Sequence, residues 1–199
     1  MNGEEGGGKR ASKKAARESA RALKHAEKIA AFEKNCAALR EEGYEQLDRT
    51  VSIARANWLG FLCGVPLAAA LFAAMWLLPH RSYSLTGVFW ADLPLFFALL
   101  AASIPVHECL HAIFWAAGNG SFRGISFGVS CATPYCACAV PMGRGRYVVG
   151  TLAPLFLLGV LPGVLALCFC NMFAAIIGVF GILSAGGDIL IACRALFSR

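Results

Sequence analysis

The chain has 199 residues, of which 58% are hydrophobic and only 15% are charged, and its mean hydropathy of +0.61 is too high for an ordinary soluble domain. The net charge of +6 does not indicate a nucleic-acid partner, because the basic residues are interleaved with acidic ones near the N-terminus and otherwise flank apolar segments. Composition and charge therefore predict a membrane protein that contacts the lipid bilayer and binds no nucleic acid.

Most charges lie near the N-terminus: residues 1–56 contain 12 of the 18 Lys and Arg and 9 of the 12 Asp and Glu. We predict a disordered tail over 1–8, where glycine dominates, and a charged cytoplasmic helical segment over 9–50. A weak apolar stripe leaves open whether this helix is solvated, self-associates or docks a partner: Ile29, Phe32, Cys36 and Leu39.

Four apolar segments follow within 51–199, at about 58–78, 91–117, 147–170 and 172–193. Each is long enough for a helix to cross a hydrocarbon core of roughly 30 Å. All four tryptophans lie near the ends of these segments, as in an interfacial aromatic belt: Trp58, Trp76, Trp90 and Trp115. The predicted fold is an all-α polytopic membrane protein with four transmembrane helices and a soluble N-terminal helix.

The distribution of Lys and Arg predicts the orientation of these spans. With a cytoplasmic N-terminus, 17 basic residues lie on the cytoplasmic side and only Arg81 lies on the other. Because basic residues are retained in the cytoplasm during insertion, we predict a multi-pass cell-membrane protein with both termini cytoplasmic.

The connection between the second and third spans, 118–146, has a different pattern. Apolar residues alternate with smaller ones from Ile125 to Cys131, and "TP" interrupts the pattern before "YCACAV". A period of two predicts a short β-hairpin at the cytoplasmic surface. Its cysteines form a weaker candidate for a second metal site, which lacks an obvious fourth ligand: Cys131, Cys136 and Cys138.

The second span contains the motif HExxH, formed by His107, Glu108 and His111. At about 100° per residue, the two histidines lie some 40° apart on one helical face, as two ligands of one metal ion must. Glu108 is close enough in angle to reach a metal-bound water and act as the catalytic base. Zinc suits imidazole ligands, but a catalytic zinc site uses three protein ligands, so one is missing. A buried polar cluster that only joins helices by hydrogen bonds is the alternative.

Asp188 is the best candidate for the third ligand, because it is the only acidic residue after Glu108. If the second and fourth spans are straight, His107 and Asp188 both lie sixteen residues, roughly 24 Å, from the outer face. Asp92 is a poor rival because it lies at the outer end of its span. Gly186 and Gly187 would let the fourth span approach another backbone closely.

Four stretches in order, "VHECLHAIFW", "TPYCACAVPM", "GTLAPLFLLGVLPG" and "AGGDILI", resemble small bacterial membrane proteins grouped as zincin peptidases. The resemblance covers roughly 44–195. The chain is more distantly similar to site-2 proteases, intramembrane zinc enzymes that pair HExxH with an aspartate on a later span. These resemblances imply Zn²⁺ at His107, His111 and Asp188, with Glu108 as base. Unlike in site-2 proteases, the glycines here precede the aspartate, and we recognise no PDZ domain in this sequence, so we do not expect such a domain to select substrates.

The predicted function is therefore a zinc-dependent, membrane-embedded metallopeptidase that hydrolyses peptide bonds of membrane-associated proteins or peptides. A substrate would have to be locally extended, and the predicted strand at 125–131 would hold it by edge pairing. Two alternatives remain open: an ion or proton transport protein with an intramembrane His/Glu/Asp site, and a non-catalytic adaptor in which zinc only staples the helices together.

Overall fold

A computed structural model of the chain describes residues 4–46, 53–78, 82–130 and 133–197. The chain divides into two compact units, Met1–Asp48 with Ala139–Pro141, and Arg49–Cys138 with Met142–Arg199. We describe each unit by itself.

The first unit contains one long helix, α1 (Glu4–Glu41). Its charged, alanine-rich sequence explains this helix, because these residues have high helix propensity. In contrast to the disorder predicted for 1–8, α1 already begins at Glu4.

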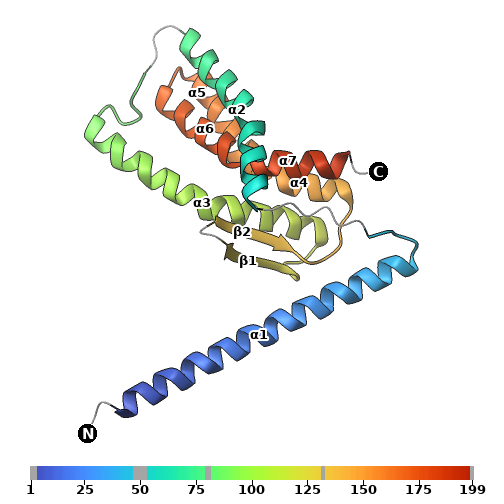
Figure 1. Cartoon of the computed structure of the whole chain (residues 1–199). Helices are drawn as coiled ribbons and strands as arrows, with labels where there is room; N and C mark the ends of the chain where they lie inside the picture. Colours follow the sequence, from blue (N-terminus) through green and yellow to red (C-terminus); the bar gives the residue numbers. More distant parts are fainter. Residues whose placement is uncertain (1–3, 47–52, 79–81, 131–132, 198–199) are drawn as a thin grey trace. The chain divides into compact units, whose positions relative to one another are not determined.

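The second unit is mainly helical, with one hairpin (Figure 1). Its helices are α2 (Ile53–Leu77), α3 (Phe89–Asn119), α4 (Arg144–Pro154), the π-helical η1 (Leu155–Val160), α5 (Leu161–Cys168), α6 (Met172–Ser184) and α7 (Gly186–Leu196). Within the part of the chain that the structure describes, three stretches are long and apolar enough to cross a membrane: Trp58–Leu77, Phe89–Asn119 and Arg144–Cys168. The pair α6 and α7 would be a fourth if counted as one bent span.

The predicted span at 172–193 is not one straight helix. It breaks at Ala185, where α6 and α7 meet at 47°. Gly186 and Gly187 follow the break, and glycine is a poor helix former. The straight-helix estimate of the depth of Asp188 therefore does not hold, although Asp188 still lies in the first turn of α7.

Close glycine contacts fix the position of α7. A side-chain carbon at Gly186 would overlap the Gly60 carbonyl oxygen of α2, and one at Gly60 would lie 2.6 Å from the Gly187 nitrogen. Gly64, one turn further along α2, faces the backbone of Ile182. Because none of these glycines carries a side chain, the two backbones approach closely and α2 crosses the joint between α6 and α7.

The predicted hairpin is confirmed. Strands β1 (Ile125–Ser130) and β2 (Thr133–Cys138) pair antiparallel, from Ile125 opposite Cys138 to Ser130 opposite Thr133. Figure 1 shows the hairpin beside the C-terminal half of α3, with β2 the nearer strand. The position of Cys131 lies outside the described residues.

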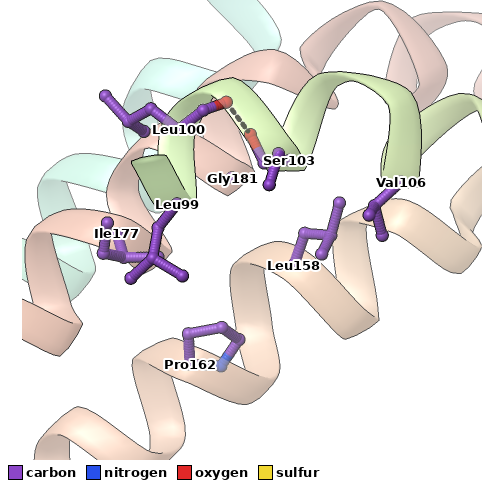
Figure 2. A pocket seen from close by; sticks show the side chains of 9 residues that line it. Leu99, Leu100, Ser103, Val106, Leu158, Pro162, Ile177 and Gly181 are labelled. Atoms are coloured by element: carbon purple, nitrogen blue, oxygen red, sulfur yellow. Dashed lines mark hydrogen bonds between the residues drawn. The ribbon is translucent and has the colours of Figure 1, made fainter. Parts of the chain in front are cut away.

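An apolar crevice separates α3 from η1, α5 and α6 (Figure 2). It encloses about 190 Å³ and is lined by aliphatic side chains, among them Leu99, Val106, Leu158 and Ile177. Ser103 is the hydroxyl-bearing residue of this lining, and its hydroxyl donates to the Leu100 carbonyl within α3 at 2.8 Å. Because that donor is satisfied inside its own helix, the crevice presents an apolar surface.

Candidate metal centre

Two imidazoles converge on the C-terminal half of α3. His107 and His111 are four residues apart, so they share one helical face, and their Nε2 atoms are 3.2 Å apart. The Nδ1 atom of His111 lies 2.9 Å from the Gly150 carbonyl oxygen on α4. Because a carbonyl can only accept, Nδ1 carries the proton of a neutral His111 and Nε2 keeps a free lone pair.

Asp188 completes the cluster from α7. Its Oδ2 lies 3.1 Å from His107 Nε2, and its Oδ1 lies 3.3 Å from His111 Nε2. Oδ2 is buried and has no hydrogen-bond partner. An acceptor of this kind is costly unless a cation binds it.

The three groups fit a zinc ion. A tetrahedral zinc with Zn–N distances of about 2.0–2.1 Å holds its ligand atoms about 3.3 Å apart. The observed separations are 3.1–3.3 Å, and one potential ligand atom from each residue lies within 4.8 Å of the others. Two imidazoles and one carboxylate form the donor set of a catalytic zinc site, which leaves a fourth position for water or substrate.

A cavity of about 280 Å³ gives access to this cluster. Glu108 lines the same cavity as His107, His111 and Asp188, so the structure brings all four predicted site residues together. The remaining walls come from α4, β2 and the ends of α6 and α7, and include Tyr147, Thr151, Thr133, Tyr135 and Cys136.

An aromatic stack holds His111 in place. The ring of Trp115 lies parallel to His111 at a centroid distance of 5.2 Å and parallel to Tyr147 at 5.6 Å. The indole N–H donates to the Tyr147 carbonyl at 3.2 Å. Trp115 is only 6% exposed, so its assignment to an interfacial belt is wrong, whereas Trp58, Trp76 and Trp90 are at least 60% exposed.

Gly150 is required by this stack. A side-chain carbon on Gly150 would overlap the indole ring of Trp115, while the Gly150 carbonyl accepts from His111. Gly150 thus fixes the tautomer of His111 through its carbonyl and leaves room for the Trp115 ring that packs against His111. Sequence reasoning missed the roles of Trp115, Tyr147 and Gly150 in holding His111. The available signal was a glycine within a helix-forming stretch, which indicates a close contact without naming the partner.

The hairpin cysteines do not form a second metal site among the described residues, where His107, His111 and Asp188 make up the group with suitable spacing. Burial, reinforced by the nearby Glu108 carboxylate, raises the pKa of the Cys136 thiol to about 11. This burial disfavours the thiolate form, through which a cysteine binds a metal ion.

Asp92, the rival third ligand, has a structural role instead. Its buried carboxylate accepts hydrogen bonds from the hydroxyls of Ser84 and Thr86 and from the backbone N–H groups of Leu85 and Thr86. Asn171 ties the same loop to the turn between α5 and α6 by donating to the Ser84 carbonyl at 3.0 Å. These bonds occupy the Asp92 carboxylate at the start of α3.

Removing any one of the three converging groups should abolish tight zinc binding. We expect near-stoichiometric zinc in the purified protein. Zinc affinity should fall about tenfold or more in His107→Ala, His111→Ala and Asp188→Ala. The loss of a ligand should lower the affinity at least as much as the loss of a group that only orients a ligand. Elemental analysis after equilibration with a weak chelator measures this. Glu108→Gln is the control and should retain zinc. Normal zinc content in Asp188→Ala would refute the third ligand.

Gly150→Ala should weaken metal binding without touching a ligand. The added methyl group displaces Trp115 and with it the ring of His111, so we expect zinc affinity to fall by about 10- to 100-fold. Competition with a fluorescent chelator measures the affinity. The matched control is Gly145→Ala on the same helix, where a side-chain carbon meets nothing within 4 Å. Equal affinities of the two variants would show that the stack does not position His111.

Comparison with family models matches residues 100–199 to the family described as "putative zincin peptidase". The matched region runs from the middle of α3 to the C-terminus and contains the HExxH motif, the hairpin and Asp188. Comparisons with curated proteins and with solved structures give no match. The family model covers half of the chain, including every residue of the candidate metal centre, and the protein therefore belongs to the family described as "putative zincin peptidase".

Proposed function

We propose that the protein is a zinc-dependent metallopeptidase, embedded in the membrane, that hydrolyses peptide bonds of membrane-associated proteins. The observation that carries this proposal is the convergence of His107, His111 and Asp188 in one cavity that Glu108 also lines. Family membership supports a metallopeptidase independently. The pairing of HExxH with an aspartate from a later helix is also the arrangement that the resemblance to site-2 proteases implies.

The proposed chemistry divides between the metal and Glu108. Zinc held by His107, His111 and Asp188 supplies a Lewis acid that polarises the peptide carbonyl and acidifies a water molecule. Glu108 accepts the proton of that water on its carboxylate and then donates it to the amine that leaves. The Gly150 carbonyl keeps the Nδ1 proton on His111, so the Nε2 lone pair stays directed at the site.

The hairpin supplies an edge on which an extended substrate can be held. Pro134 has no N–H, so its nitrogen is best accommodated facing away from β1. Alternate residues of an antiparallel strand face the same edge, which places the Cys136 N–H and carbonyl on the outer edge of β2. Thr133, Pro134, Tyr135 and Cys136 line the metal cavity. We therefore propose edge pairing with β2 rather than with the strand at 125–131.

The apolar helices and their flanking charges support the proposed membrane location. Three helical stretches and the bent pair of α6 and α7 are apolar enough to span a bilayer. Several large apolar side chains on them are exposed, including Phe97 at 61% and Ile104 at 53% on α3, which lipid would cover. The excess of basic residues predicts cytoplasmic termini, with the hairpin and the metal centre toward the cytoplasmic side.

Glu108→Gln tests the proposed reaction. Because the amide cannot accept the proton, we expect the variant to retain zinc while cleavage slows by about 10²- to 10⁴-fold. The substrate is a tagged reporter with a single apolar span, reconstituted with the purified protein in liposomes, and product formation is followed on gels. Unchanged cleavage by the variant would overturn the mechanism. Zinc-dependent ion flux without cleavage would favour transport, and retention of zinc with neither activity would favour an adaptor.

The orientation is tested by labelling in intact cells with a membrane-impermeant maleimide. We expect Tyr83→Cys, in the exposed loop before α3, to be labelled from outside. Phe197→Cys, exposed at the end of α7, should be labelled only after the membrane is permeabilised. Peptide mass spectrometry separates these positions from the native cysteines, and the reverse pattern would contradict the proposed topology.

A further inference from the structure

A second cavity lies beside the metal centre, between α3 and the hairpin. It is open on one side and has a volume of about 390 Å³, and it is lined by Pro105, Glu108 and Cys109 of α3, Phe127, Gly128 and Val129 of β1, and Pro134 and Tyr135 of β2. Three of these residues, Glu108, Pro134 and Tyr135, also line the cavity that contains His107, His111 and Asp188. The two cavities therefore adjoin, and Glu108 lies on the wall that they share.

The walls of this second cavity suit an apolar group. Glu108 is its only ionisable carboxylate, and the other side chains are apolar or weakly polar. Two apolar residues of its wall are largely exposed to solvent, Val129 at 73% and Phe127 at 58%. Such surface is costly in water and is usually covered by a ligand or a partner. A side-chain carbon on Gly128 would overlap the ring of Tyr135, so this glycine allows Tyr135 to lie across the hairpin at the boundary with the metal cavity.

We infer that this cavity is a specificity pocket for the substrate residue that follows the cleaved bond, and that it selects a large apolar side chain. The inference rests on the proposed function. Glu108 must come within hydrogen-bond reach of the leaving nitrogen to protonate it. The Cβ atom of the residue that carries this nitrogen is only two bonds away from it. The side chain of that residue therefore also starts close to Glu108. The cavity that shares Glu108 is the space open to that side chain.

Size and charge set the expected selectivity. A cavity of this volume accommodates a Leu, Met or Phe side chain, and burying one favours cleavage over Gly by about 10- to 100-fold. An acidic side chain would be repelled by Glu108 and would lose its hydration against Phe127 and Val129. We therefore expect Asp and Glu to be the least accepted residues after the cleaved bond.

The first test reads this preference directly. The purified zinc-loaded protein is incubated with peptides prepared from digested membrane proteins, and mass spectrometry identifies the residue after each new cut. We expect Leu, Met and Phe to be enriched at least tenfold over Gly. In Val129→Asp the preference should shift toward Lys and Arg, because the new carboxylate attracts a cation. Phe122→Asp is the matched control, since Phe122 is similarly exposed at 65% but does not line the cavity.

The second test needs no catalysis. Cys109 is exposed and lines the cavity, so an occupant should protect it from alkylation. We expect leucinamide, which carries both a free amine and an apolar side chain, to slow alkylation of Cys109 severalfold in the zinc-loaded protein. Glycinamide should not protect Cys109, and Cys193, which is exposed on α7 outside the cavity, should react at an unchanged rate with either compound.

The two tests distinguish an error in the proposed pocket from an error in the proposed peptidase activity. Cleavage by the wild type without an apolar preference, or an unchanged preference in Val129→Asp, would overturn the pocket and leave the peptidase standing. An equal effect of Phe122→Asp would also overturn it. Absence of cleavage together with protection of Cys109 by leucinamide would overturn the peptidase while supporting the cavity as a binding site. Absence of both would overturn the two proposals together.

Discussion

The close approach of two imidazoles and one carboxylate is the constraint around which the described helices are arranged. His107 and His111 are brought together by α3 alone, because the helix repeat places residues four apart on one face. Asp188 belongs to α7, which packs against α2 and α4 and carries Asp188 to the two imidazoles although the carboxylate Oδ2 has no hydrogen-bond partner there. Glycine contacts with α2 hold one side of α7, and the aromatic stack with Gly150 fixes the imidazole opposite. A cation at the centre would offset the cost of this convergence.

The sequence predicted much of the candidate site because ionisable residues are so scarce in this chain. HExxH implies a shared helical face, and Asp188 is the only later acidic residue, so elimination identified it without knowledge of the fold. The supporting argument from depth assumed a straight fourth helix, which the break at Ala185 contradicts. The partnership of Asp188 with the histidines survives because it followed from composition rather than from helix geometry. The hairpin was equally predictable, since its period of two is a local property.

The remaining features depend on contacts between segments far apart in the chain. Nothing local distinguishes a tryptophan at a membrane interface from one packed against a ligand, so Trp115 was assigned wrongly. The π-helical turn at Leu155–Val160 lies beside close contacts between Leu158, Gly159 and α6, which no hydrophobic pattern encodes. The boundary formed by Gly128 and Tyr135 likewise arises only when β1 and β2 pair. Periodicity predicts elements, whereas cavities arise from the fit between them.

Because the chain breaks at Ala185, the three candidate ligands lie on two helices that are placed independently. His107 and His111 lie on one uninterrupted helix, α3, so their spacing does not depend on how the other helices are placed. Asp188 lies on the short helix α7, whose axis differs from that of α6. The geometry of the centre then depends on the placement of α7, which packs against α2 and α4. Substitutions of Gly60 on α2, which contributes no ligand, would alter how firmly a metal ion is held, which gives evolution a means to tune the centre while every ligand stays the same.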